Sequence, residues 1–291
     1  MDTLSFDRYA AYYNCLYQDK NYAEEAAFVL ALLQKHDAFS QAASGVTTGS
    51  SVKKTDFPEQ QSEFPNLGGS CEVRGTLLEL GCGTGGHAFE MARVGYAVQG
   101  VDLSPQMIHM AQTVPFAKQS PGFPAPEFVT GDARSVRLGR RFDAVVSLFH
   151  VMSYQTDEKD LLAALETAKA HLRPGGFFLF DFWHGPAVLK DRPGPREKRM
   201  SNDTVRVTRF AQPQLELDKN IVHVDFTVSV QAKTSGETGT IFERHSMRYW
   251  FLSELRFLAT CAGLELLCSG AWMKPGLPTD DDWYAWVLLR A

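Results

Sequence analysis

The sequence predicts an α/β fold with a doubly wound, mostly parallel sheet at its centre, and three patterns support this. Between residues 75 and 185, short apolar runs alternate with stretches of helical spacing, as strands do when crossover helices join them. The first run leads directly into a glycine-rich turn, which is how an open α/β sheet builds a pocket at its carboxyl edge. Three runs of alternating polarity between residues 204 and 250 then predict a separate antiparallel sheet.

The composition is that of an ordinary globular protein and argues against several classes of partner. With 291 residues, the chain suits one large domain or a domain with an appended lobe. Its formal charge of −5 gives no general attraction to polyphosphate, so we expect no nucleic-acid partner. The five cysteines lack metal-ligand spacing, so we expect no metal site. No leader opens the sequence and no apolar run approaches the roughly 18 residues that span a bilayer, so we expect a cytoplasmic protein without a membrane partner.

The glycine-rich turn is the strongest signal for a binding site. A strand ends at Leu80, helical spacing resumes at Ala88, and four glycines lie between them: Gly81, Gly83, Gly85 and Gly86. Glycine lacks a Cβ, so the backbone can take positive φ and lie directly against a ligand. Three of the four also satisfy G-x-G-x-x-G, the dinucleotide fingerprint. The turn alone therefore does not distinguish NAD from S-adenosylmethionine (SAM).

Glu79 favours SAM over NAD. A carboxylate at the end of the first strand is well placed for an ammonium group, which the methionine part of SAM carries and NAD lacks. The segment from Glu79 to Gly85 resembles the E-x-G-x-G-x-G motif of class I SAM-dependent methyltransferases. This resemblance implies a Rossmann-like fold with a seven-stranded sheet, SAM as the methyl donor and S-adenosylhomocysteine as its product. It also implies that Glu79, Gly81, Cys82, Gly83 and Gly85 contact the cofactor.

Two further acids follow the second and third strands. Asp102 ends the strand at 96–101, some 20 residues past the turn, where an acid accepts hydrogen bonds from ribose hydroxyls. It is alternatively an acid at the start of the helix that Ser104 caps. Asp132 follows the strand at 127–129 and resembles the family's adenine-binding acid, although a surface turn explains it as well. The other cofactor contacts that we expect are Tyr13, Tyr22, Leu103, Met107, Ala133, Leu148 and Phe149.

Residues 1–37 are predicted to form a helical lid. Aromatic residues recur there at three- and four-residue spacing and so share one face of a helix. Core packing also explains such a face, but a buried tyrosine hydroxyl needs a partner, which suits a half-polar cleft. The segment resembles the N-terminal lid of small-molecule methyltransferases, which implies a catalytic role for Tyr13 and acceptor contacts from Tyr9 and Tyr17. A second helix is expected from Asn21 to about Lys35, and the polar composition of residues 38–74 predicts a flexible linker.

His150 is the best general-base candidate. The apolar fourth strand at 142–148 ends just before it, and open α/β enzymes place their chemistry at the carboxyl ends of central strands. A lone histidine is more often structural than catalytic, so both readings stay open. Tyr154, in the same loop, and Trp183, after the fifth strand, are the acceptor contacts that we expect from this edge.

The segment 186–250 is predicted to be an antiparallel cap over residues 75–185, serving as an acceptor wall or as the surface of a homodimer. A basic cluster that includes Arg199 lies just before the first alternating run at 204–211, and it is part of a solvated loop or of a clamp for acceptor phosphates. Residues 251–291 return to the core with a helix and a closing β-hairpin. Such a hairpin separates class I methyltransferases from NAD-binding Rossmann domains.

The lid and the cap together resemble N-methyltransferases that act on nucleotide-linked amino sugars. The resemblance implies that a methyl group moves by in-line displacement to an amine of a small molecule. An O-methyltransferase that uses His150 as its base is the alternative. An NAD-dependent oxidoreductase and a non-catalytic SAM-binding protein are further readings from other classes.

Overall fold

A sheet of seven strands forms the centre of the molecule, in a computed structural model that describes residues 12–43 and 73–291. The strand order is β10-β11-β5-β4-β1-β2-β3, and all neighbours from β5 to β3 are parallel. Only β11 and β10 run antiparallel, so the predicted doubly wound sheet with a closing hairpin is confirmed. The strands are β1 (Gly75–Leu80), β2 (Tyr96–Asp102), β3 (Glu127–Thr130), β4 (Phe142–Ser147), β5 (Leu172–Trp183), β10 (Glu265–Ala271) and β11 (Tyr284–Arg290).

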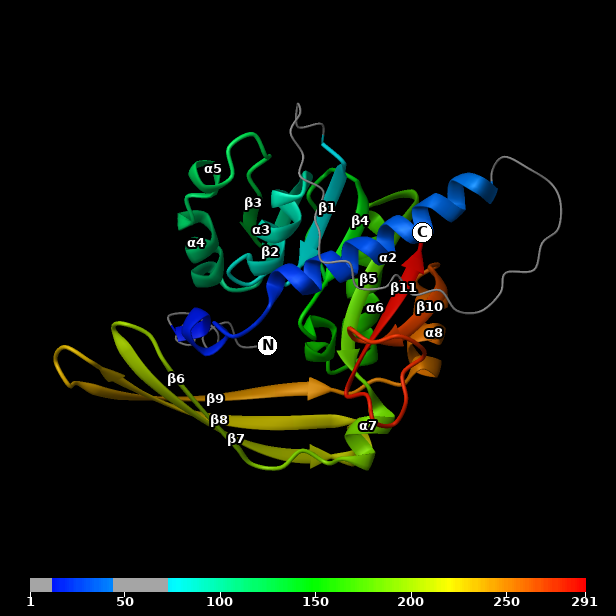
Figure 1. Cartoon of the computed structure of the whole chain (residues 1–291). Helices are drawn as coiled ribbons and strands as arrows, with labels where there is room; N and C mark the ends of the chain where they lie inside the picture. The colour runs from blue at the N-terminus through cyan, green and yellow to red at the C-terminus, as the bar shows by residue number, and fades with distance from the viewer. Residues whose placement is uncertain (1–11, 44–72) are drawn as a thin grey trace.

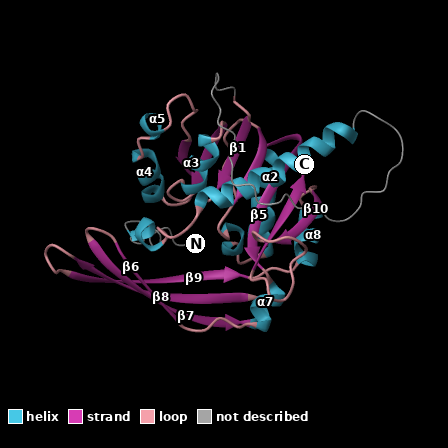
Figure 2. Ribbon diagram, in the orientation of Figure 1, coloured by secondary structure: helices cyan, strands magenta, loops and turns pink. Residues whose placement is uncertain are grey.

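Helices cover both faces of this sheet (Figure 2). The central strands β1, β4 and β5 are mostly apolar because both of their faces are buried, which is why their sequences read as nearly continuous apolar runs. One face carries α2 (Tyr22–Ala43), α3 (Gly86–Arg93), α4 (Pro105–Thr113) and α5 (Phe116–Gln119). The other carries α6 (Glu158–Ala170) and α8 (Leu252–Cys261). Two short elements follow strand ends, η1 (Val151–Tyr154) after β4 and α7 (Gly185–Lys190) after β5.

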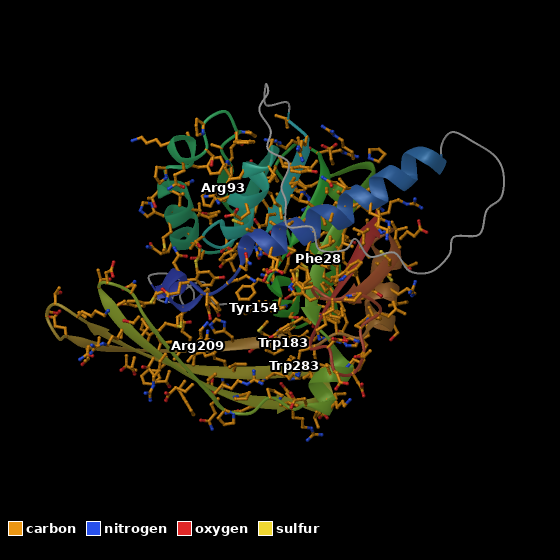
Figure 3. The ribbon with its side chains drawn as sticks, in the orientation of Figure 1. Phe28, Arg93, Tyr154, Trp183, Arg209 and Trp283 are labelled. Carbon is orange, nitrogen blue, oxygen red and sulfur yellow. The ribbon has the colours of Figure 1, made fainter. Side chains whose placement is uncertain are left out.

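The α2 helix belongs to this core layer, and this corrects the predicted lid of residues 1–37. Val29 and Leu30 are buried in α2, and Phe28 lies edge-on to Trp272 and Trp286, with ring centroids 5.4 and 6.3 Å apart (Figure 3). A face that buries such side chains cannot open without exposing them to water. Of the described residues, only 12–21 precede this helix; they are called the lid here, and their closure over a ligand stays a prediction. The helix also continues to Ala43, past the predicted end near Lys35 and into the range predicted as a linker.

The cap is a second sheet of four antiparallel strands, which Figure 1 shows beneath the carboxyl ends of the parallel strands. The three predicted strands are present, and a fourth, β6, was missed. Its sequence, R-E-K-R-M-S, has no apolar alternation, because β6 is an edge strand whose charged side chains protect an open edge. The strands are β6 (Arg196–Ser201), β7 (Val205–Glu216), β8 (Ile221–Ala232) and β9 (Thr238–Arg248).

One face of the cap, called here the inner face, packs against the rest of the molecule. Near β6 it meets residues 12–17, and near α7 it meets Trp183 and Trp283. Residues 12–21 and the cap therefore both lie beside the carboxyl edge of the core. A hollow of about 470 Å³ lies at the opposite, amino edge, lined by residues such as Arg141 and Lys169, and it is remote from the glycine turn. Among the described helices, none is long and apolar enough to cross a membrane.

Candidate active site

The glycine turn has the open backbone that a bound ligand requires. Gly81 and Gly83 take left-handed φ angles of 78° and 53°, which side chains rarely tolerate. A Cβ on Gly81 would come within 2.5 Å of Val151, so this position is closed by packing. Among residues 12–43 and 73–291, the nearest atom that a Cβ on Gly83 would meet is the Tyr13 hydroxyl, at 4.0 Å. The turn therefore presents bare backbone at Gly83, on the side that faces the lid.

Glu79 supplies a buried carboxylate beside this turn. Its side chain is about 1% exposed, and its Oε1 lies 3.5 Å from Nδ1 of His87. Its Oε2 is buried and has no hydrogen-bond partner within residues 12–43 and 73–291. A buried charged oxygen without a partner is costly, so this atom fits a ligand cation such as the ammonium group of SAM.

A chain of charges joins Glu79 to the start of α2. Nε2 of His87 lies 2.8 Å from Glu25, whose other oxygen lies 2.5 Å from Nζ of Lys20. Burial lowers the pKa of His87, but hydrogen bonds to Glu25 and Glu79 outweigh it and raise the pKa above its usual value near 6.5. The stability that the charged ring contributes is therefore complete below about pH 6.5 and is lost as the pH rises through the raised value. Sequence reasoning missed His87 and Glu25, because they meet across 62 residues of chain.

Asp102 joins the glycine turn to the start of α4. Its Oδ2 accepts a hydrogen bond of 2.7 Å from the backbone of Gly83, and its Oδ1 accepts one of 2.9 Å from the backbone of Ser104. Ser104 caps α4 by accepting a hydrogen bond from the backbone of Met107, as expected. Burial raises the pKa of Asp102, while the backbone donors oppose this. The carboxylate thus lies beside the bare backbone of Gly83, and its ribose contact stays a prediction.

Asp132 lies past the end of β3 and is held by Arg134, which sequence reasoning missed. The guanidinium approaches it to 2.6 Å at Oδ2, and the backbone of Arg134 donates to Oδ1 at 2.8 Å. The same arginine lies 2.9 Å from Asp160 on α6. Hydrogen bonding to Arg134 lowers the pKa of Asp132, so the carboxylate is fixed as an ionised acceptor. Its adenine contact stays a prediction.

The other expected cofactor residues lie at the same edge. Met107 and Leu148 are buried, and Leu103 and Ala133 are half-buried where the chain leaves β2 and β3. Cys82 is buried in the turn, and burial raises the pKa of its thiol, which keeps it neutral. The structure thus gathers the predicted cofactor residues, although their individual contacts stay predictions.

Residues 12–21, the predicted lid, lie against the glycine turn. The Thr84 hydroxyl donates to Asn14 at 2.8 Å, and Tyr13 hydrogen-bonds Tyr22. Burial raises the pKa of Tyr22 to about 12, so its hydroxyl stays protonated at neutral pH. Tyr17 lies edge-on to Phe149 at 5.1 Å. Tyr9, the other acceptor residue predicted in this region, lies outside the described residues.

His150 stands at the end of β4, in a backbone conformation that marks a constrained site. Phe149 and His150 both take left-handed φ angles, 67° and 63°, which are uncommon for residues with large side chains. The His150 ring stacks on Tyr284, with centroids 4.4 Å apart and planes 19° apart. Its Nδ1 lies 2.7 Å from Oδ2 of Asp181, a residue that sequence reasoning missed.

The inner face of the cap contributes a polar wall opposite His150 and the lid. The Tyr154 hydroxyl lies 2.8 Å from Nδ1 of His245, whose Nε2 lies 3.1 Å from Glu243. Arg209 donates to the hydroxyl of Tyr17 at 2.9 Å, so cap and lid are directly bonded. Figure 3 shows Tyr154 and Arg209 facing each other between the cap and the core. Burial raises the pKa of Tyr154, so this residue is a neutral hydrogen-bonding group.

Arg199 is not part of this wall, which corrects the prediction that it contacts the acceptor. It lies on the outer face of the cap, is largely exposed and pairs with Glu197. Successive residues of a strand point to opposite faces, and the neighbouring Lys198 is the one that faces inward. Its Nζ lies 2.9 Å from Asp19 and 5.5 Å from the ring centre of Tyr17.

Trp183 packs against the inner face of the cap beside Trp283, a partner that was missed, and its acceptor contact stays a prediction. Its ring meets Trp283 edge-on at 5.7 Å and lies 6.5 Å from the His150 ring. Both indole Nε1 atoms are buried and lack a hydrogen-bond partner among the described residues. Figure 3 shows the pair between the cap and the ends of β5 and β11. An aromatic wall with two available donors therefore borders His150.

Comparisons with known proteins agree with this geometry. Residues 77–176 match the family model described as a methyltransferase domain. Over 218 residues the chain is 29% identical to the dTDP-3-amino-3,4,6-trideoxy-alpha-D-glucopyranose N,N-dimethyltransferase of Streptomyces venezuelae, a match that covers 72% of this chain and 84% of that protein.

Two solved structures show the same fold over almost the whole chain. A SAM-dependent methyltransferase from Clostridium acetobutylicum is 17% identical, with a TM-score of 0.71 over 98% of both chains. Streptomyces venezuelae DesVI is 22% identical, with a TM-score of 0.68 over 100% of this chain and 99% of its own. The closing hairpin, the glycine turn with Glu79 and the family match all favour SAM over NAD as the ligand of the turn. Residues 77–176 therefore form a methyltransferase domain, and the chain has the fold of SAM-dependent methyltransferases.

Proposed function

We propose that this methyltransferase acts on an amine of a small molecule, and specifically on a nucleotide-linked amino sugar. The relative from Streptomyces venezuelae, which carries such a substrate in its name, matches 72% of this chain. The observation that carries the proposal is the pair of basic side chains on the inner face of the cap, Lys198 and Arg209, beside Tyr17 of the lid. Their positive charge suits the diphosphate of a nucleotide-linked sugar.

The residues at the carboxyl edge divide into those that hold the donor and those that handle the acceptor. We propose that Glu79 takes the ammonium of SAM, Asp102 its ribose and Asp132 its adenine. When bound, SAM supplies an activated methyl group for in-line displacement. Alignment of donor and acceptor can lower such a barrier by roughly 7–11 kcal/mol. We assign this alignment to the lid, with Tyr13 nearest the turn, and to the wall made by Tyr17, Tyr154 and Trp183.

His150 supplies the remaining chemistry. An amine attacks only when it is neutral, so a base must remove the proton that an amino sugar carries near neutral pH. With Nδ1 turned to Asp181, the other ring nitrogen, Nε2, is the atom that can accept this proton.

A screen with radiolabelled SAM tests the acceptor class. We expect label in dTDP-linked 3-amino or 4-amino sugars and much less label in the matching free amino sugars, which lack the diphosphate. Amino acids and small phenols complete the panel. Transfer to phenols with none to amines would contradict the proposal and indicate an O-methyltransferase.

We also propose that two copies of the chain pair through the outer face of the cap. Phe210 and Phe242 flank Thr227 in one row across β7, β8 and β9, and their side chains are 39% and 77% exposed. Large exposed apolar side chains at adjacent positions are typical of a protein interface.

Light scattering should give the mass of a dimer for the wild-type protein and the mass of a monomer for Phe242→Asp. The matched variant Phe257→Asp, at an exposed phenylalanine on α8, should leave the dimer intact. A monomeric wild-type protein would rule out this interface.

A further inference from the structure

Asp181 is a buried acid with no place in the reaction as described so far. It lies near the carboxyl end of β5, inside the apolar run from Phe177 to Phe182, and only 1% of the residue is exposed. An acid in such a run is expensive to bury unless its charge is used. In the antiparallel register with β11 it stands opposite Trp286, which carries no charge to balance the acid.

Both oxygens of Asp181 are directed at His150. Oδ1 accepts a hydrogen bond of 3.0 Å from the backbone N–H of His150. Oδ2 lies 2.7 Å from Nδ1 of the same residue, although the two atoms are not aligned as a regular hydrogen bond. A proton on Nδ1 makes this contact favourable, because an Nδ1 lone pair would be repelled by the carboxylate oxygen. Nε2 then carries the lone pair whenever the ring is neutral.

The backbone also depends on this acid. Phe149 and His150 form a left-handed pair, a conformation that persists only where the surroundings hold it. Asp181 holds it through the backbone N–H, while Tyr284 stacks on the ring and fixes its plane. A histidine that served only to fill space would not need its backbone, its ring plane and its tautomer all fixed.

We propose that Asp181 is a positioning residue that keeps Nδ1 of His150 protonated, so that Nε2 accepts the proton of the acceptor. This rests on the proposed role of His150 as base. In the step it supports, the N–H⁺ bond of the acceptor ammonium breaks and its electron pair stays on nitrogen. The proton joins the lone pair of Nε2, which gives a neutral amine and an imidazolium. Asp181 stays ionised and stabilises the imidazolium until the proton passes to water.

Asp181→Asn tests the inference, because the two oxygens have different partners. The amide oxygen of the new side chain should keep the hydrogen bond from the backbone N–H of His150, so the NH₂ group turns toward Nδ1. Nδ1 must then accept a hydrogen bond from this NH₂ group, and the neutral ring changes to the Nε2–H tautomer. Multiple-bond ¹⁵N–¹H NMR should show Nδ1–H in the wild-type protein and Nε2–H in the variant. With an amine acceptor, kcat should fall by about 10²–10⁴-fold with little change in KM, as when a triad aspartate is replaced by asparagine.

The controls separate this inference from the proposed acceptor. Asp143→Asn, at a half-buried aspartate of β4 at the opposite edge of the sheet, should leave the His150 spectrum and kcat unchanged. An Nε2–H tautomer in the wild-type protein overturns the inference, whether or not the variant folds. An inverted tautomer with unchanged kcat overturns it as well. If the tautomer inverts while no amine is a substrate, the positioning role stands and the proposed acceptor fails.

Discussion

Glu79→Gln should weaken the binding of S-adenosylhomocysteine by about 30- to 150-fold while leaving 5′-methylthioadenosine unaffected. The first ligand carries the amino-acid part of SAM with its ammonium group, and the second lacks it. The substitution keeps the shape of Glu79 but removes the charge of the buried Oε2, which has no partner among the described residues. A hydrogen bond to a charged group is worth about 2–3 kcal/mol, which corresponds to the expected factor.

Calorimetric titration of both ligands gives a direct answer. The matched variant Glu265→Gln, at an acid exposed on β10, should bind both ligands as the wild-type protein does. An equal loss for the two ligands would show that Glu79 only shapes the turn. Unchanged affinity for both would place the ammonium elsewhere, and the assignment of Glu79 would be wrong.

The core could be predicted from the sequence because its signals are local. The glycine turn, the apolar strands and the cap of Ser104 on α4 each depend on residues within a few positions of one another. The closing hairpin followed from the resemblance, and the antiparallel pairing of β10 with β11 confirms it. The predicted cofactor residues end at one edge because the carboxyl ends of parallel strands meet there.

The partners of the site residues could not be predicted, because they come from distant parts of the chain. Asp181 reaches His150 from 31 positions away, and Glu25 reaches His87 from 62. Each acid stands in a stretch whose local pattern shows only a strand or a helix. Arg199 illustrates a second cause. Because β6 was not recognised as a strand, the sequence did not show which basic side chains of the cluster face inward. Side chains alternate between the two faces of a strand, and in β6 it is Lys198 that faces inward.

His150→Asn should lower kcat for an amine acceptor by about 10²-fold or more at pH 7, with a loss that shrinks as the pH rises. Asparagine tolerates the left-handed φ of 63° at this position, so the backbone of the loop should be kept. Without the base, only the fraction of acceptor that is already neutral can react. That fraction grows about tenfold per pH unit below the pKa of the acceptor amine, because deprotonation by water replaces deprotonation by the ring.

The pH profile of the His150→Asn variant distinguishes N-methylation from O-methylation, the two reactions that the family resemblance allows. A hydroxyl acceptor loses its proton during the transfer, so rising pH would not restore the rate and O-methylation would be indicated. His109→Asn, at an exposed histidine of α4, is the matched control and should keep the wild-type profile. Since Asp181 acts only through His150, the double variant His150→Asn with Asp181→Asn should be no slower than His150→Asn alone. Additive losses would mean that the two residues act independently and that Asp181 has a role of its own.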